Sequence, residues 1–193
     1  MARPREFDID TALKAAMETF WLKGYTATSM ADLMDAMGLQ KGSIYKAFGN
    51  KHALFLSALR NYLQTAFFSL KSRMDQATTP LEAIEVFLGN AVQTCSMSPR
   101  KGCFALNTVV ELGPHDDETL QCLNDHFANI RQLVTQTIQA GQAQQLMRSD
   151  TPAHELAEYL MTVQIGIVSS AKHAHSVEAK AKVAGFALAQ VTA

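Results

Sequence analysis

Hydrophobic residues recur three and four positions apart in most segments of the 193-residue chain, and this spacing predicts amphipathic α-helices. The first helical pattern begins near Asp8 or Asp10, either of which can cap a helix, and it ends at Gly24. Similar patterns follow to the end of the chain, and no segment shows a β-strand pattern of alternating apolar and polar residues. The pattern predicts an all-α fold of about nine helices.

Two short helices around a glycine turn are predicted between Thr28 and Phe48. Thr28 or Ser29 can cap the first helix, and Gly38 can end it because glycine accepts the left-handed backbone conformation. The second helix directs Ile44 inward. The residues that then point elsewhere are Lys41, Ser43, Tyr45 and Lys46. A helix that enters the DNA major groove needs such a polar and basic surface.

A long helix is predicted to begin after Gly49, with Asn50 as its cap. Lys51 lies in the first turn, where free N–H groups and the helix dipole favour a phosphate oxygen. Arg3 and Arg5 precede any helical pattern. They belong either to a disordered tail or to an arm that reaches phosphates or a minor groove.

The segment from Phe7 to Leu56 resembles the helix-turn-helix domain of the TetR family of transcriptional regulators. The matching residues are Ala12, Ala16, Phe20, Gly24-Tyr25, Thr28-Ser29, Asp32-Leu33, Gly38, Lys41-Gly42-Ser43-Ile44-Tyr45, Phe48, Lys51 and Leu54-Phe55. Two positions depart from the family pattern. Met34 replaces a small residue, and Gln40 replaces the usual serine cap of the second helix. We therefore expect a less firm start to that helix and a Gln40 side chain that could touch DNA.

The resemblance implies a DNA-binding domain over residues 6–66, with the helix-turn-helix at about 29–48, and an effector-binding and dimerisation domain over residues 67–193. It implies a cytoplasmic homodimer, a repressor that a small-molecule or thiol-reactive inducer releases from a palindromic double-stranded DNA operator. The DNA-binding residues predicted on this basis are Arg3, Arg5, Thr28, Ser29, Gln40, Lys41, Gly42, Ser43, Tyr45, Lys46 and Lys51.

The effector pocket is predicted between segments 54–73, 81–96, 103–112 and 119–140. The segment from Cys103 to Leu112 is apolar nearly all round, which is typical of a buried helix. Its Asn107 and Glu111 are then partly buried polar groups that need partners. The predicted effector-site residues are Phe87, Cys103, Phe104, Asn107, Glu111 and Phe127.

Cys103 has two open interpretations. It opens a helix after Arg100 and Lys101, whose charges favour a thiolate. The Gly102-Cys103 pair also resembles the reactive-cysteine position of TetR-family members that sense electrophiles or oxidants, and equally a Gly-Cys-Phe segment of a member for which a metal role is implied. The other interpretation is a small buried apolar side chain, because free cysteine is among the most buried residue types.

The last two predicted helices each carry an apolar seam with spacings of four and three residues, as in a coiled coil. The seam residues are Leu156, Leu160, Val163, Ile167, Val177, Ala181, Ala184 and Leu188. They either pack into the core of their own chain or form a four-helix dimer interface, and the family resemblance favours the interface.

Charge is divided unevenly along the chain. Residues 1–74 hold ten Lys and Arg against six Asp and Glu, a net +4, while residues 75–193 hold seven against twelve, a net −5. This suggests that only the first part contacts phosphate. Three cysteines without a C-x-x-C motif argue against a disulfide framework. We also expect no membrane span and no signal peptide, because no long apolar run is present.

Motifs of enzymes that bind nucleotides, use a catalytic serine or carry a metalloprotease zinc site are absent, so no enzyme, cofactor or metal site is predicted. His173 and His175 could bind a transition metal, although the dipole at a helix C-terminus also favours histidines. The alternative to a regulator is an all-α small-molecule or metal-binding protein without operator binding.

Overall fold

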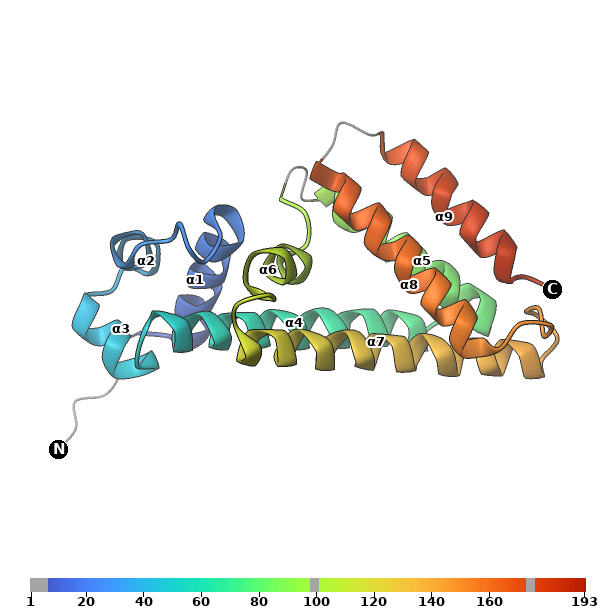
Figure 1. The fold of residues 1–193 in the computed structure, drawn as a ribbon, viewed down its shortest axis with the longest axis horizontal. Helices are drawn as coiled ribbons and strands as arrows, with labels where there is room; N and C mark the ends of the chain where they lie inside the picture. The colour runs from blue at the N-terminus through green and yellow to red at the C-terminus, as the bar shows by residue number, and fades with distance from the viewer. Residues whose placement is uncertain (1–6, 98–100, 173–175) are drawn as a thin grey trace.

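The computed structural model describes residues 7–97, 101–172 and 176–193, and these residues form nine α-helices with no strand (Figure 1). The helices are α1 (Ile9–Lys23), α2 (Met30–Met37), α3 (Lys41–Phe48), α4 (Lys51–Asp75), α5 (Pro80–Met97), α6 (Phe104–Leu112), α7 (Asp117–Ala143), α8 (Ala153–Ser169) and α9 (Val177–Val191). The predicted all-α fold is confirmed. Within the described residues no helix is long and apolar enough to cross a membrane.

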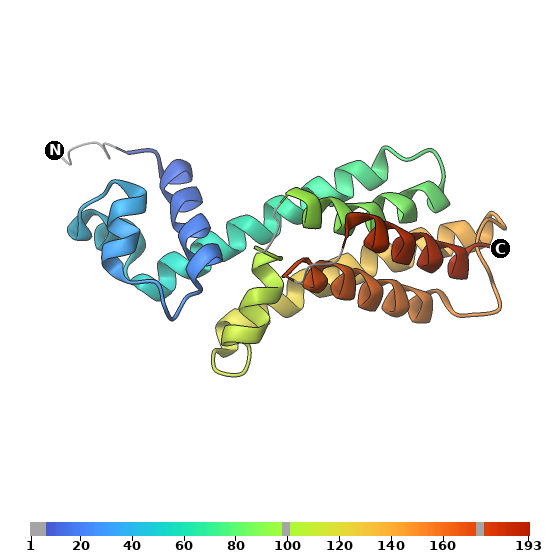
Figure 2. The ribbon, with the colours of Figure 1, turned by 90° about the horizontal axis from the view of Figure 1, so that it is seen from above.

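The long helices α4 and α7 lie side by side and connect the two ends of the molecule (Figures 1 and 2). Helices α1, α2 and α3 form one end, and α5, α8 and α9 pack on the other end. The short helix α6 lies between the two groups, where it contacts both α4 and α7.

Local capping signals set the boundaries of the first helices as predicted. Ser29 and Asp32 form a reciprocal capping box at the start of α2, and Gly38 ends that helix with φ at 63°. Asn50 caps α4 by accepting a hydrogen bond of 2.8 Å from the backbone N–H of Ala53. The side chain of Gln40 makes no capping bond to α3, which agrees with the expected less firm start of that helix.

One of the two hydrophobic cores joins α1, α2, α3 and the first half of α4 to α6 and α7, and we call it the junction core. Its buried members are Ala16, Phe20, Leu33, Ile44, Leu54, Phe55, Leu56, Leu59, Leu63, Phe104, Ala105, Leu112 and Leu123. Aromatic rings pack edge to face here, with centroids 5.1 Å apart for Phe20 and Phe55 and 6.0 Å apart for Phe55 and Phe104. The junction core draws residues from both sides of the domain boundary predicted after residue 66.

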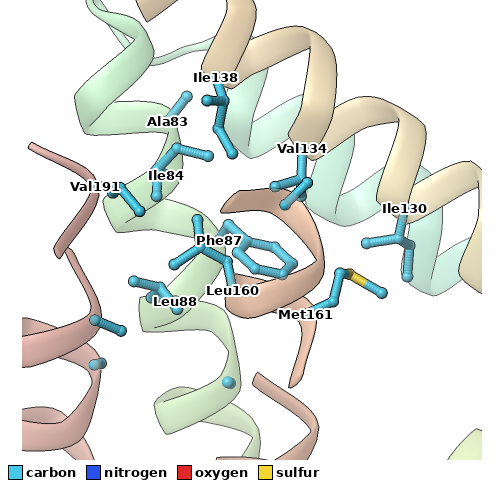
Figure 3. Packing of buried hydrophobic residues seen from close by; sticks show 14 of the residues in the cluster. Ala83, Ile84, Phe87, Leu88, Ile130, Val134, Ile138, Leu160, Met161 and Val191 are labelled. Carbon is cyan, nitrogen blue, oxygen red and sulfur yellow. The ribbon is translucent and has the colours of Figure 1, made fainter. Parts of the chain in front are cut away.

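The distal core lies among the C-terminal part of α4 and helices α5, α7, α8 and α9, and it surrounds Phe87. Figure 3 shows Phe87 with Ile84 and Leu88 of α5, Val134 of α7 and Leu160 of α8. Nearly all of its other members are aliphatic. This core fixes the relative positions of the C-terminal helices.

The predicted seam of α8 and α9 lies largely in this distal core. Leu156, Leu160, Ile167 and Ala184 are each at most 8% exposed, so packing within one chain already uses these side chains. Val163 and Leu188 are partly buried against the same core, whereas Val177 and Ala181 are exposed. The larger hydrophobic side chains that α8 and α9 expose are instead Tyr159, Val177, Val183 and Phe186. Packing within the chain thus buries four of the eight seam residues, and the dimer interface predicted for the seam stays a prediction.

Candidate DNA interface and ligand cavity

Helix α3 presents a continuous polar and basic surface at one end of the molecule (Figure 1). Its inward residue Ile44 is 1% exposed and holds the helix against the junction core. The exposed residues are Gln40, Lys41, Gly42, Ser43, Tyr45 and Lys46, all of them predicted DNA contacts. The Lys41 ammonium lies 5.6 Å from the Tyr45 ring centroid, so these two side chains occupy neighbouring positions on the surface.

Two other predicted DNA contacts point inward in this structure. Thr28 is 1% exposed, and its hydroxyl donates a hydrogen bond of 2.6 Å to the carbonyl of Gly24. The Lys51 ammonium donates one of 2.6 Å to the carbonyl of Tyr25 and lies 4.4 Å from that ring, where burial lowers its pKa. Both residues therefore hold the turn between α1 and α2. Ser29 is exposed beside its capping bond, and Arg3 and Arg5 lie outside the described residues.

Glu111 of α6 binds the same turn from the other side. Its carboxylate accepts hydrogen bonds from the backbone N–H groups of Tyr25, at 3.0 Å, and Thr26, at 2.7 Å. Gly24 makes this approach possible, because a Cβ there would lie 2.8 Å from the Glu111 Oε2 atom. We call this pair of hydrogen bonds the tether. The partner expected for the partly buried Glu111 is thus the backbone of the turn between α1 and α2.

Further polar contacts fix the two ends of α6. Asn107 donates a hydrogen bond of 2.9 Å to the backbone carbonyl of Lys101. The side-chain ammonium of Lys101 pairs with Glu18 and lies 4.2 Å from the Trp21 ring centroid. At the start of α7, Asp116 accepts a hydrogen bond of 3.0 Å from the backbone N–H of Thr119. Its carboxylate also lies 2.5 Å from the imidazole of His52. Burial opposes ionisation of Asp116, but these bonds outweigh it and lower its pKa.

A cavity of ≈ 180 Å³ lies between the junction core and the distal core. Residues of five segments line it, and the polar ones are Tyr62, Ser69, Asn90, Thr94, Cys103, His126 and Gln164. No Asp, Glu, Lys or Arg is among the lining residues. Burial lowers the pKa of His126 to about 4, so its imidazole is neutral at neutral pH. The cavity is therefore polar but uncharged.

Cys103 and Phe127 are the two predicted effector residues that line the cavity. The Cys103 sulfur lies 3.7 Å from the Tyr62 hydroxyl, and burial together with this thiol raises the pKa of Tyr62. The other four predicted residues lie elsewhere. Phe87 is in the distal core and Phe104 in the junction core, while Asn107 and Glu111 bind backbone groups.

The sequence analysis missed Tyr62, His126 and Gln164. These three residues lie on three different helices, and only the packing of α4, α7 and α8 brings them to one cavity. In the sequence, such residues could be found only as polar positions within the apolar face of an amphipathic helix.

Metal binding finds no support in the part of the chain that the structure describes, where no group of three or more His, Cys, Asp or Glu residues could hold an ion. His173 and His175 lie outside the described residues. The other two thiols are distinct from Cys103. Cys95 is buried and donates to the carbonyl of Ile167, and burial raises the pKa of both Cys95 and Cys122.

Comparison with known proteins gives two family matches. Residues 12–58 match the model described as "Bacterial regulatory proteins, tetR family", and residues 80–185 match "Tetracyclin repressor-like, C-terminal domain". The chain is 31% identical over 192 residues to the HTH-type transcriptional repressor ComR of Escherichia coli, covering 96% of this chain and 90% of that protein. It is 26% identical over 189 residues to the repressor BdcR of the same organism, covering 96% and 91%.

A solved structure extends this similarity to three dimensions. The chain is 30% identical to a cysteine mutant of the TetR family transcriptional regulator CifR complexed with 26-bp double-strand operator DNA. The match has a TM-score of 0.86 and covers 98% of this chain and 100% of the other. The predicted helix-turn-helix thus lies in a fold that another protein uses to bind an operator.

Proposed function

The chain belongs to the TetR family of DNA-binding transcriptional regulators, and from this premise we propose a cytoplasmic homodimeric repressor that a small uncharged molecule releases from its operator. The observation that carries this proposal is the exposed surface of α3, held against the junction core by Ile44. A major-groove helix needs such a surface of polar and basic side chains. Similarity to an operator-bound regulator supports the same function.

The DNA-facing residues divide into two roles. Lys41, Ser43 and Gln40 lie at the start of α3, where base edges are read, and we assign them to sequence recognition. Tyr45 and Lys46 lie further along the helix and contact the phosphate backbone. Lys51 acts indirectly in this proposal, because its ammonium is committed to the turn between α1 and α2.

Dimerisation is proposed through the exposed faces of α8 and α9. Tyr159, Val183 and Phe186 are 40%, 48% and 73% exposed, and a large exposed apolar side chain is typical of an interface. A Phe186→Glu change should yield monomers that bind operator poorly, since the second half-site is lost. Val110→Glu is the matched control, because Val110 is 82% exposed on α6. Light scattering gives the mass, and a dimeric Phe186→Glu variant would move the interface elsewhere.

The size and lining of the cavity support the proposal of a small uncharged inducer. At ≈ 180 Å³ it is smaller than the roughly 300–1,000 Å³ of pockets for drug-sized ligands. A charged ligand would lose its hydration without gaining an opposite charge, which is costly. The lining hydroxyl and amide groups can instead bind an uncharged molecule that carries a hydrogen-bonding oxygen or nitrogen.

Helix α6 supplies the connection between cavity and DNA. Cys103, Ala105 and Leu106 at its start line the cavity, and Glu111 near its end forms the tether. A ligand that displaces α6 must therefore move the turn between α1 and α2, or break the tether. Either change alters the spacing of the two recognition helices in the dimer, and with it operator affinity.

The test of operator binding uses the DNA upstream of the protein's own gene. Fluorescence anisotropy should show saturable binding that weakens as salt rises and that a scrambled duplex does not reproduce. Equal affinity for both duplexes would instead support the alternative, an all-α small-molecule or metal-binding protein without an operator.

A thiol-reactive inducer is the more specific version of this proposal. Cys103 lines the cavity beside Tyr62, so an adduct there would occupy the ligand space and press on the start of α6. Treatment with N-ethylmaleimide should release operator from the wild type and leave the Cys103→Ser variant bound. Equal release in both proteins would leave a reversible ligand as the better account.

A further inference from the structure

A second hollow is lined by residues of α4 and α7, two of the helices that also line the cavity. An open groove of ≈ 480 Å³ runs between α4 and α7, and Phe67, Phe68, Gln121, Cys122 and Asp125 are among its lining residues. Phe68 is 57% exposed, and its ring lies 5.9 Å from that of Phe67, so the groove offers an aromatic surface. Arg60 and Glu118 pair with each other at 2.8 Å and largely cancel in charge.

His126 is the residue that the groove and the cavity share. It lines both hollows, and no other lining residue is common to the two. Its imidazole therefore forms part of the wall between an open surface groove and the uncharged interior. The neighbouring ring of Phe127, with its centroid 5.5 Å away, continues the wall on the cavity side.

We propose that the groove between α4 and α7 is an outer binding chamber of the ligand site, and that small uncharged molecules enter the cavity by displacing the His126 side chain. This rests on the proposed function only for the identity of the ligand site. The chambers differ in chemistry, because the groove offers exposed aromatic rings and charged groups and the cavity only uncharged ones.

The contacts of His126 make its displacement inexpensive. Within the described residues the imidazole has a ring contact with Phe127 and no hydrogen bond, so a rotamer change breaks no protein hydrogen bond. Burial keeps the ring neutral, which spares the cost of moving a charge. Rotamer changes of partly exposed side chains are fast compared with ligand binding.

Stronger contacts lie on another side of the cavity, beside the lining residue Asn90. Between α4 and α5 the Arg73 guanidinium donates hydrogen bonds of 2.8 Å to Asn90 and 3.0 Å to Gln93. Opening the cavity beside Asn90 would break these charge-assisted bonds, whereas rotation of His126 breaks none. The groove is therefore the favoured route.

Two thiols make the route measurable. Cys122 lines the groove and Cys103 lines the cavity, so one protein carries a reporter on each side of His126. The probes are iodoacetamide, which is uncharged, and iodoacetate, which is an anion of similar size. In both reactions the thiolate sulfur bonds to the CH₂ carbon and iodide leaves. Mass spectrometry of peptides from the full-length protein gives the alkylation rate at each cysteine.

The matched variants are His126→Ala and Asn129→Ala, because Asn129 lines the groove but not the cavity. We expect His126→Ala to raise the iodoacetamide rate at Cys103 about tenfold relative to Asn129→Ala. In the wild type, replacing iodoacetamide by iodoacetate should lower the alkylation rate far more at Cys103 than at Cys122. An unchanged Cys103 rate in His126→Ala, or equal iodoacetate discrimination at both thiols, would overturn the proposal.

Buried Cys95 monitors the fold, since its reaction would reveal global opening. If His126→Ala exposes Cys95, the conservative His126→Gln variant replaces it and must show the same selective gain at Cys103. Because no DNA is present, this result is separate from the proposed function. Loss of the rate effect removes the entry route, while alkylation of Cys103 that leaves operator affinity unchanged removes the effector role of the cavity.

Discussion

The junction core packs aromatic rings edge to face around Phe55 and Phe104, whereas the distal core packs mainly aliphatic side chains around Phe87. Aromatic pairs prefer edge-to-face or offset-stacked arrangements, whereas aliphatic side chains pack without such a directional preference. The junction core is where orientation matters, because it supports α3. The distal core holds α8 and α9 in place.

The cavity lies where the two cores meet. Cys103 and Phe127 pack against both of them. A ligand bound in this cavity, as proposed above, would contact both cores. The comparison teaches that the two cores differ both in side-chain type and in the helices that they join.

The largest effect expected from breaking this comparison is on stability. Phe104→Ala and Phe87→Ala should each lower the free energy of unfolding by about 3–5 kcal/mol, since each empties a fully packed site. Urea unfolding followed by circular dichroism should show one transition in both variants, because α4 and α7 run through both cores. An early separate transition in Phe104→Ala would show that the DNA-proximal end unfolds independently.

The next effect concerns the surface that the junction core supports. Lys41→Ala should weaken operator binding by about 1–3 kcal/mol and relax the preference for one base pair, if Lys41 reads a base edge. Tyr45→Ala should weaken binding to all duplexes similarly, because backbone contacts carry no sequence information. Anisotropy titrations with single-base operator variants separate the two. Lys71→Ala is the control, since Lys71 pairs with Asp75 on α4.

The tether that joins α6 to the DNA-proximal end gives a smaller effect. Glu111→Gln keeps the shape but removes the charge, so stability should fall by about 1–2 kcal/mol. The second measurement is the ratio of operator affinities before and after N-ethylmaleimide treatment. In Glu111→Gln this ratio should be closer to one than in the wild type. Glu118→Gln, which removes an exposed ion pair with Arg60, should leave that ratio unchanged. An unaltered ratio in Glu111→Gln would place the coupling outside the tether.

The last expected effect is a pH dependence at the edge of the cavity. The folded protein lowers the pKa of His126 from 6.5 to about 4, so the unfolded chain binds the proton more readily between these values. Stability should therefore fall as pH drops from 6.5 toward 4 and be unaffected by this group above that window. Urea unfolding at several pH values should show a shallower decline in His126→Gln. An identical slope in both proteins would mean that the cavity wall tolerates a charge.

Much of the DNA-proximal end was predictable because its signals are local. The capping box of Ser29 and Asp32 joins residues three positions apart, and Gly38 ends α2 through its own backbone conformation. The inward position of Ile44 follows from helical periodicity, and it fixes which residues of α3 are exposed. In contrast, the bond of Lys51 to the Tyr25 carbonyl, 26 positions away, was not visible in the sequence, and the phosphate contact assigned to Lys51 stays a prediction.

The sequence by itself determined the helices, their caps, the surface of α3 and the family, since each depends on neighbours within a few positions or on a short motif. Tertiary structure decided that Glu111 binds backbone groups 85 and 86 positions away, that His126 lines two hollows, and that Leu156, Leu160, Ile167 and Ala184 are buried within their own chain. Periodicity shows that a face is buried, but only helix packing selects what it is buried against.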